Sequence, residues 1–324
     1  MGLRYMGRLL DQHAADTTIR AVCDISPEAC AAAAHLFTDH GVEPPPQRLD
    51  FVSFLADFAG ELDAALILTP HVYHFEQAAA CLTAGLDVLL EKPMVMTSAE
   101  ARHLIALRDQ THRLLVVGFQ GGLSPQVRAA VRLIRSGEIG TLTGISATIW
   151  QNWREATAGK WRQQPDISGG GMFFDTGAHL LNTVCDLAGE PFIEISAWLD
   201  HLNAPVEVNS AIQGRLASGA LVTLHSNGFT IPPKQSEILV FGTEAVLRTG
   251  AWGERLDLWR RGRTRFRKVA VPASSGPWQE FLRIRRGEID NPTPPEIGLR
   301  MALLWDAIQA SAGQGGTPVR VGAP

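Results

Sequence analysis

Short apolar runs alternate with longer amphipathic segments through the first third of the chain. The runs have the length of strands, and the intervening segments have apolar residues at helical spacing. Strands are expected at Ile19–Cys23, Leu62–Leu68, Asp87–Leu90 and Leu114–Gly118, and helices at about Ser26–Phe37, Val72–Ala84 and Thr97–Arg108. Strands that alternate with helices predict a parallel sheet with helices on both faces.

The pattern changes after Gly140, where polar and apolar residues alternate with a period of two. These stretches are Leu142–Trp150, Ile193–Trp198, Ala211–Leu216, Leu221–Ser226, Glu237–Phe241 and Leu256–Trp259. Because turns and not helices join the later ones, they predict a mostly antiparallel sheet with one covered face. We therefore expect a doubly wound α/β Rossmann domain over residues 1–120 and an α+β domain over residues 121–324. Two C-terminal helices, about Trp278–Arg286 and Pro295–Ala312, are expected to pack back across the domains.

The chain opens with a glycine pattern. Gly2 and Gly7 occupy the outer positions of G-x-G-x-x-G, and Arg4 replaces the middle glycine. Such a pattern leads into a helix whose N-terminus binds a pyrophosphate, while an acidic residue after the next strand binds the ribose hydroxyls. Asp24 stands at that position. Arg4 either obstructs a dinucleotide or offers its guanidinium to a phosphate, and the sequence leaves both open.

The strand that normally precedes this glycine pattern is absent from the sequence. In a sheet of order 3-2-1-4-5-6 that strand is central, so its absence predicts two unpaired edges inside the domain. We therefore expect that the natural chain begins upstream of Met1 or that the sequence is a fragment. The Asp24 carboxylate would repel a 2′-phosphate and Ile25 offers no cation to bind one, which predicts NAD(H) in preference to NADP(H). The alternative for Asp24 is an ordinary turn residue.

Several predicted strands end in polar residues. Asp24, the segment Thr69–His74 and Lys92 all lie at the carboxyl ends of parallel strands, where ligands bind in folds of this class. Lys92 is followed by Pro93, which restricts the turn. Its ammonium group can bond a substrate hydroxyl and stabilise a developing alkoxide. The alternative is a solvated loop lysine.

A glycine-rich stretch, Ser168–Gly171, leads into the apolar segment Met172–Leu187. Ser168 can cap the predicted helix, in which Asp175 and His179 are four residues apart and share one face. A carboxylate beside an imidazole suits proton transfer, because histidine titrates near neutral pH. A pair at this spacing is more often an ordinary polar pair, so the catalytic interpretation depends on the rest of the chain.

The segment between the first long period-two stretch and the glycines is rich in aromatic and basic residues. It contains Trp153, Arg154, Lys160, Trp161 and Arg162. Indole rings stack on the C–H faces of sugars, and cations bond hydroxyls or a carboxylate. The alternative is a loop whose tryptophans fill a domain interface.

Composition narrows the classes of function. The 324 residues are 45% hydrophobic and carry a net charge of -4, which gives no electrostatic reason to expect nucleic acid or an anionic membrane as a partner. The four cysteines form no CxxC pair, so neither a disulfide framework nor a zinc site is predicted. No apolar run is long enough to span a bilayer. We expect a cytoplasmic protein that binds no metal.

Taken together, these motifs resemble the Gfo/Idh/MocA family of nicotinamide-dependent oxidoreductases. The resemblance rests on Asp24, on Thr69-Pro70 with His74, on Gly85–Pro93 with its Glu91-Lys92-Pro93 ending, on Ser136–Gly140, on Ser168–His179, on Phe241–Thr243 and on Pro318–Val321. The family implies a Rossmann domain, a second domain with an open, mostly antiparallel sheet, and an active site between them. It also implies a homodimer or homotetramer that associates through that sheet, and a cis bond before Pro93.

The resemblance also assigns site residues. It implies catalytic roles for Lys92, Asp175 and His179. The residues expected to bind the cofactor are Gly2, Arg4, Tyr5, Met6, Gly7, Asp24, Thr69, Pro70, His74, Glu91 and Lys92, and those expected to bind substrate are Lys92, Gln120, Trp161, Arg162, Asp175 and His179. The chain departs from the family at Gln120-Gly121-Gly122, where many members have a basic pair, and at Asn182, where many have an aspartate. Both positions usually face the substrate or its surroundings.

The sequence therefore predicts hydride transfer between NAD(H) and a carbinol or carbonyl carbon of a sugar, polyol or related small molecule. In this hypothesis His179 is the general base, Asp175 orients it, and Lys92 stabilises the oxyanion. Two alternatives stay open: a glycosidase or lyase of the same family that retains NAD, and a non-catalytic regulator that binds a dinucleotide. Product formation without added NAD and without net NADH would identify the first.

Overall fold

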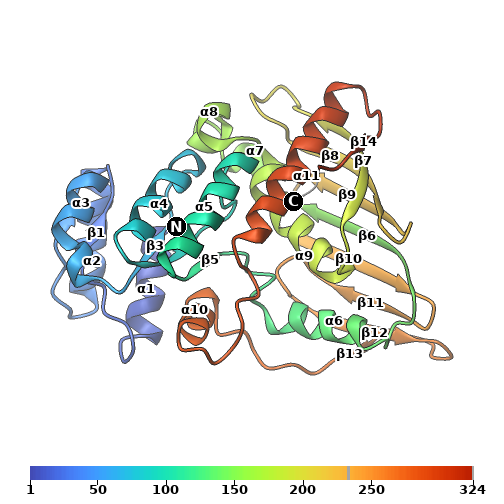
Figure 1. Ribbon diagram of the computed structural model, residues 1–324, viewed down its shortest axis with the longest axis horizontal. Helices are drawn as coiled ribbons and strands as arrows, with labels where there is room; N and C mark the ends of the chain where they lie inside the picture. Colours follow the sequence, from blue (N-terminus) through green and yellow to red (C-terminus); the bar gives the residue numbers. More distant parts are fainter. Residues whose placement is uncertain (232–233, 323–324) are drawn as a thin grey trace.

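A computed structural model describes residues 1–231 and 234–322 of the chain. Its first part alternates helices and strands as the sequence predicts (Figure 1). The helices are α1 (Gly2–Gln12), α2 (Pro27–Asp39), α3 (Phe51–Phe58), α4 (His74–Thr83) and α5 (Ser98–Thr111), with short 3-10 turns η1 (Ala59–Glu61) and η2 (His71–Tyr73). The strands are β1 (Val22–Cys23), β2 (Gln47–Arg48), β3 (Ala64–Ile67), β4 (Asp87–Leu90) and β5 (Leu115–Val117). The strand expected from Ile19 is thus confined to its last two residues, and no strand or helix was expected at the short β2 and α3.

All pairings in this first part are parallel, but they form two separate sheets. β1 pairs with β2, while β3, β4 and β5 form a three-stranded sheet. Among the described residues β1 and β3 therefore each have one hydrogen-bonded neighbour, which confirms the two unpaired edges expected inside the domain. Thr97 begins α5 with a capping box, since its side chain accepts from the Glu100 N–H and the Glu100 side chain accepts in return.

The second part is built on a nine-stranded sheet of order β13-β12-β11-β10-β6-β9-β8-β7-β14. Its strands are β6 (Leu142–Trp150), β7 (Phe192–Asp200), β8 (Asn209–Leu216), β9 (Leu221–Asn227), β10 (Gln235–Gly242), β11 (Ala245–Thr249), β12 (Leu256–Arg260), β13 (Arg267–Lys268) and β14 (Val319–Arg320). The β6–β9 pair is parallel and the other pairs are antiparallel. This confirms the expected open, mostly antiparallel sheet.

The second part of the chain also contains helices, and three of them, α6 (Pro125–Arg135), α9 (Ala178–Ala188) and α11 (Glu296–Gly313), pack on the large sheet. The others are the short α7 (Trp153–Ala156) and α8 (Pro165–Ser168) and α10 (Pro277–Arg285), with a 3-10 turn η3 (Trp161–Gln163) and a π-helical turn η4 (Phe173–Gly177). α9 packs on β6 and α11 on β7. Ile145, Ile212 and Leu224 point into this covered face and are buried. Among the described residues no helix is both long enough and apolar enough to cross a membrane.

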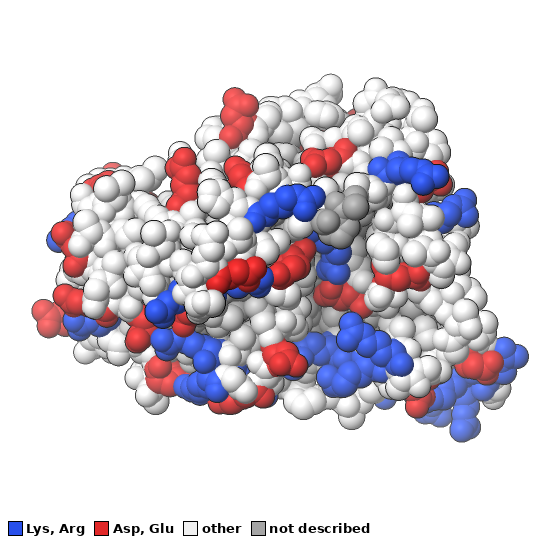
Figure 2. Space-filling model, in the orientation of Figure 1, with Lys and Arg blue, Asp and Glu red and all other residues white. Residues whose placement is uncertain are grey.

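The two C-terminal helices contact the first part of the chain. α10 lies beside α1 and β5 in Figure 1, and its Phe281 and Leu282 pack against Leu89 and Val116 of the small sheet. α11 contacts α5 as well as β7. These helices hold the two sheets in a fixed relation. Over the face in Figure 2 acidic and basic side chains are interspersed, with the larger basic groups in the lower half.

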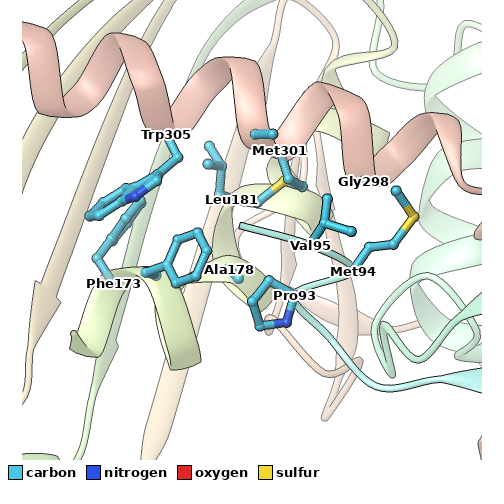
Figure 3. Close-up of a pocket in the computed structure, with 11 residues that line it drawn as sticks. Pro93, Met94, Val95, Phe173, Ala178, Leu181, Gly298, Met301 and Trp305 are labelled. Carbon is cyan, nitrogen blue, oxygen red and sulfur yellow. The ribbon is translucent and has the colours of Figure 1, made fainter. Parts of the chain in front are cut away.

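α11 also braces the turn after β4. Figure 3 shows Trp305, Met301 and Gly298 of α11 facing Pro93 and Met94 around an apolar cavity of about 20 Å³. A methyl group on Gly298 would collide with the Met94 side chain, so this position needs glycine. The Lys92–Pro93 peptide bond in this turn is cis, as the resemblance implied. α11 therefore fixes the turn that carries Lys92.

We expect Trp305→Ala to lower the free energy of unfolding by about 3–5 kcal/mol, since it removes a large buried ring. Trp305 is 4% exposed, and its ring lies 5.2 Å from that of Phe174 between centroids. Urea denaturation followed by circular dichroism measures the change. Ile25→Ala is the control because Ile25 is 81% exposed. Equal effects of the two substitutions would contradict the bracing role of α11.

Candidate active site

A cavity of about 580 Å³ lies where the two parts of the chain meet. Its wall combines α1, the turn after β4, the segment after β5, the segment from Gln151 to Arg162, the η4–α9 helix and the loop before β10. The residues that line it are Met1, Arg4, Tyr5, Arg8, Glu91, Lys92, Gly118, Gln120, Gln151, Asn152, Trp153, Ala156, Thr157, Lys160, Arg162, Asp175, Thr176, His179, Lys234, Trp252 and Pro277. The three residues predicted to be catalytic all belong to this wall.

Lys92 and Asp175 form an ion pair across the junction of the two parts. The Lys92 Nζ donates to Asp175 Oδ1 and to the Asp175 backbone carbonyl, both at 2.7 Å. Both side chains are buried. Because an ammonium group has three N–H donors, one of them stays available to an oxygen atom in the cavity.

The second carboxylate oxygen of Asp175 is bonded as well. Trp153 Nε1 donates to Oδ2 at 3.0 Å, and Arg162 Nε donates to the same oxygen at 3.2 Å. Burial alone would raise the pKa of Asp175, but Lys92, and then His71 and Arg162, hold it well below its usual range. Asp175 is therefore a permanent anion that positions two cations.

His179 is not bonded to Asp175. Its Nδ1 is buried without a hydrogen-bond partner among the described residues, which leaves Nε2 as the ring nitrogen available to the cavity. The ring is packed between Phe119 and Trp252, with centroid distances of 6.0 and 5.7 Å. Desolvation lowers the pKa of His179 well below its ordinary value, and the nearby Lys92 and Lys234 lower it further. The imidazole is thus a neutral proton acceptor, but the prediction that Asp175 orients it is wrong.

The π-helical turn η4 explains why these two side chains separate. Asp175 lies inside this turn, whereas the prediction of a shared face assumed a regular α-helix from Met172. A π turn inserts an extra residue and rotates what precedes it. The Asp175 carboxylate therefore faces Lys92, and His179 faces the cavity from the following α9.

Glu207, from the loop before β8, holds the start of this helix. Its carboxylate accepts the N–H groups of Gly171 at 2.6 Å and Phe174 at 3.2 Å, and its carbonyl accepts the Met172 N–H at 2.8 Å. Burial raises the pKa of Glu207 to about 7, although the two N–H bonds oppose this. Ser168 instead donates to the Gln164 carbonyl, so the prediction that Ser168 caps this helix is wrong.

Two histidines lie behind the ion pair. His71 donates its Nδ1–H to the Ser168 carbonyl at 2.7 Å, and its Nε2 lies 4.0 Å from Asp175 Oδ1. Desolvation lowers the pKa of His71 to about 3. His74 is fully buried, and its ring nitrogens contact the carbonyls of Pro93 and Thr69, both at 2.8 Å. The prediction that His74 contacts a cofactor is therefore wrong; His74 joins the turn after β3 to the turn after β4.

The residues predicted to bind a cofactor fall into two groups. Arg4, Tyr5, Glu91 and Lys92 line the cavity, and the Tyr5 hydroxyl donates to Glu91 at 3.0 Å. Burial and the adjacent Glu91 raise the pKa of Tyr5, and burial raises that of Glu91. Gly2, Met6, Gly7, Asp24, Thr69 and Pro70 do not belong to the cavity wall. Asp24 follows β1 and is exposed, with one carboxylate oxygen bonded to the Ser26 N–H.

The residues predicted to bind substrate are also divided. Gln120 and Arg162 line the cavity, but Trp161 does not. Its ring instead packs edge-on against His71 at 4.8 Å and lies under the Arg162 guanidinium at 4.3 Å. Asn182 is fully buried, and it bonds Arg300 and Asp186. Position 182, expected to face the substrate or its surroundings, is therefore not part of the cavity wall in this chain.

No motif in the sequence marks Lys234 or Trp252, yet both line the cavity. Lys234 precedes β10, and its Nζ lies 3.8 Å from the centroid of the Trp252 ring. Glu207 likewise stands outside any recognised motif. Trp153 belongs to the aromatic and basic segment that the sequence does identify. Lys234, Trp252 and Glu207 instead lie in loops between strands, where sequence periodicity carries no signal.

Two family models match the chain. The model described as "Oxidoreductase family, NAD-binding Rossmann fold" matches residues 1–119, and the model described as "GFO/IDH/MocA C-terminal domain" matches residues 127–248. The first match covers α1 to β5, and the second runs from α6 into β11.

Sequence relatives include enzymes that act on sugars and inositols. A putative UDP-kanosamine synthase oxidoreductase subunit of Amycolatopsis mediterranei is 30% identical over 216 residues, which cover 61% of this chain and 56% of that protein. The scyllo-inositol 2-dehydrogenase (NADP(+)) IolW of Bacillus subtilis is 22% identical over 279 residues, which cover 78% of this chain and 77% of that enzyme. The match to the first relative therefore spans little more than half of its length.

Solved structures share the complete fold. An inositol dehydrogenase homolog from Azotobacter vinelandii, complexed with NAD+, has a TM-score of 0.83 at 18% identity and covers 99% of this chain and 94% of its own. A levoglucosan dehydrogenase, complexed with NADH and levoglucosan, has a TM-score of 0.81 at 23% identity. The match covers 99% of this chain and 95% of that chain. These similarities confirm the Rossmann domain and the second domain with its large sheet.

We expect the free energy of unfolding to fall as the pH drops below about 6.5, because His71 takes up a proton on unfolding. A histidine whose folded pKa is about 3 contributes stability that is present above pH 6.5 and is lost as the pH falls towards 3. Between about pH 6.5 and pH 5, protonation of His71 on unfolding should lower the free energy of unfolding by about 2 kcal/mol.

Urea denaturation of the protein and of His71→Asn at about pH 7.5 and about pH 5 measures this share. The asparagine variant should lose less stability on acidification than the unaltered protein, whatever its stability at the higher pH. The same acid sensitivity in both proteins would show that His71 does not cause it.

Proposed function

Because the chain belongs to the Gfo/Idh/MocA family of oxidoreductases, we propose that it transfers hydride between NAD(H) and a carbinol or carbonyl carbon of a sugar, polyol or related small molecule. The observation that carries the proposal is the meeting of Lys92, Asp175 and a neutral His179 at the wall of one cavity. The cavity also contains the two arginines of α1. The reacting groups and a place for a dinucleotide therefore adjoin.

The residues present fit a dinucleotide. The N-terminal N–H groups of α1 have no side-chain cap, and Arg4 and Arg8, one turn apart, line the cavity beside them. Free N–H groups and guanidinium groups are suitable partners for a pyrophosphate. Asp24 follows β1 outside the cavity wall, and in this proposal its exposed carboxylate would accept ribose hydroxyls and its charge would repel the 2′-phosphate of NADP(H). When bound, the nicotinamide supplies or receives the hydride.

The chain's own groups would manage the proton and the charge. His179 Nε2 accepts the hydroxyl proton in the oxidative direction and returns it in the reductive direction. The free N–H of Lys92 donates to the same substrate oxygen and stabilises the negative charge that develops on it. Asp175 keeps the Lys92 ammonium in place through two hydrogen bonds. Asp175 therefore acts on the reaction through Lys92, which replaces the role first predicted for it.

We further propose that the protein is a cytoplasmic homodimer or homotetramer that associates through the open face of the large sheet. Several large apolar side chains on or beside the sheet strands are exposed: Ile193, Trp198, Leu221, Phe241 and Trp259. Exposed apolar side chains on the open face of a sheet are commonly covered by another subunit. The face also carries Ser146, Thr223 and Arg215, which suits a contact with polar as well as apolar character.

We expect NADH to bind the purified chain and to quench its tryptophan fluorescence, because Trp153 and Trp252 line the cavity. NADPH should bind more weakly, since its 2′-phosphate would approach Asp24. Asp24→Ser should narrow the difference between the two cofactors. If NADPH binds as tightly as NADH to the unaltered chain, the preference for NAD(H) is wrong.

We expect His179→Ala to slow turnover about 100- to 10,000-fold, the usual contribution of a general base. NADH affinity should change little, because His179 stands at the substrate end of the proposed site. Lys92→Ala should act in the same way. NADH formation at 340 nm with a sugar or polyol that the enzyme oxidises measures turnover, and fluorescence quenching measures affinity.

His201→Ala is a matched control, because His201 is exposed in the loop after β7. It should leave both quantities unchanged. Equal losses of turnover and of NADH affinity in His179→Ala would indicate a structural role for His179. Unchanged turnover in Lys92→Ala would remove Lys92 from the mechanism.

A further inference from the structure

The cavity carries far more positive than negative charge, although the chain as a whole has a net charge of -4. Six cationic side chains line it, and only two carboxylates do. The cations are Arg4, Arg8, Lys92, Lys160, Arg162 and Lys234, and the carboxylates are Glu91 and Asp175. The face in Figure 2 carries charges of both signs, and the net charge of the chain is negative, so the positive excess belongs to the cavity and not to the whole molecule.

Both carboxylates are already occupied. Asp175 bonds Lys92 and Arg162, and Glu91 accepts from the Tyr5 hydroxyl and the Lys92 backbone N–H. The remaining cations of the cavity are Arg4, Arg8, Lys160 and Lys234. Among the described residues no carboxylate lies within ion-pair distance of these four. Their charges are available to a ligand.

The dinucleotide accounts for only part of this excess. A pyrophosphate carries two negative charges, and Arg4 and Arg8 stand beside the N-terminus of α1, where it is proposed to bind. Lys160 and Lys234 belong to the second domain and lie outside that helix. Glu254 and Asp175 attract the Lys234 ammonium from beyond ion-pair distance, so among the described residues neither lysine has a direct anionic partner once the cofactor has been placed.

Lys234 lies close to the reacting groups. Its ammonium stands 3.8 Å above the Trp252 ring, and the same ring contacts His179 at a centroid distance of 5.7 Å. Trp252 thus links Lys234 to the proposed base. Lys160 Nζ donates to the Ala156 carbonyl and is otherwise exposed, so two of its donors are free.

We propose that the substrate is a sugar or polyol that carries a negatively charged group, a carboxylate or a phosphate ester, and that Lys234 and Lys160 bind this group. The inference rests on the proposed function, because it assigns Arg4 and Arg8 to the dinucleotide. Lys234 would bind the anionic group of the substrate beside the base. The cation–π contact with the Trp252 ring keeps the Lys234 side chain extended over that ring. A charge-assisted bond from an ammonium group discriminates strongly against a neutral analogue.

The test measures binding to the protein saturated with NADH, by calorimetry at low salt. The probes are glucose, galactose and mannose, each compared with its uronate and its 6-phosphate. At least one anionic probe should bind about tenfold or more tightly than its neutral counterpart, and the uronate and phosphate arms identify the group. Equal or tighter binding of the neutral sugars, or no binding of any anionic probe, overturns the proposal.

Variants connect the preference to Lys234. Lys234→Met should abolish the preference for the anionic probe, whereas Lys234→Arg should retain most of it. Lys268→Met is the control, because this substitution removes the same charge from the chain at a distant place. Lys268 is exposed on the edge strand β13, which β12, β11 and β10 separate from β6. If Lys234→Met and Lys268→Met have the same effect, Lys234 does not bind the anion.

Failure of this inference is distinguishable from failure of the proposed function. NADH binding is measured first in the same titration, and its absence contradicts the proposed function together with this inference. NADH binding combined with equal affinity for neutral and anionic sugars contradicts the charged substrate alone.

Discussion

The buried contact between Lys92 and Asp175 is the constraint on which the site depends. The two residues come from different domains and are 83 positions apart, yet Lys92 bonds both the side chain and the backbone of Asp175. Taking two charges out of water is expensive unless further hydrogen bonds satisfy them. Trp153 and Arg162 provide those bonds on the other carboxylate oxygen. The domain junction is therefore ordered around one anion.

The same arrangement sets the protonation state of His179. Asp175 is turned towards Lys92 and does not bond the imidazole. The positive charges of Lys92 and Lys234 disfavour protonation of His179 and so lower its pKa. Phe119 and Trp252 pack against the ring, and the desolvation of the imidazole lowers its pKa. A neutral imidazole is the form that accepts a proton, so desolvation and nearby cations prepare the base that a carboxylate partner was expected to prepare.

The C-terminal helices give this junction its rigidity. α10 covers a face of the small β3–β5 sheet, and α11 packs on both α5 and β7. The chain thus returns from the second domain to support the first. Gly298 of α11 lies against Met94 in the turn that follows Lys92, and Trp305 stacks on Phe173 at the other end of the same apolar cavity, as Figure 3 shows. Packing outside the 580 Å³ cavity thereby fixes the position of Lys92 in the wall of that cavity.

The sequence by itself determined the features that are local. Alternating strands and helices, the period-two segments and the position of Lys92 after β4 follow from periodicity and from turn residues near each element. Tertiary structure alone decided which groups meet. The π turn at Asp175, the burial of His74, the bonds from Glu207 and the place of Lys234 beside Trp252 all depend on contacts between distant segments or on local helix geometry that periodicity does not encode. Side-chain spacing specifies a face only when the helix is regular, and here the helix is not.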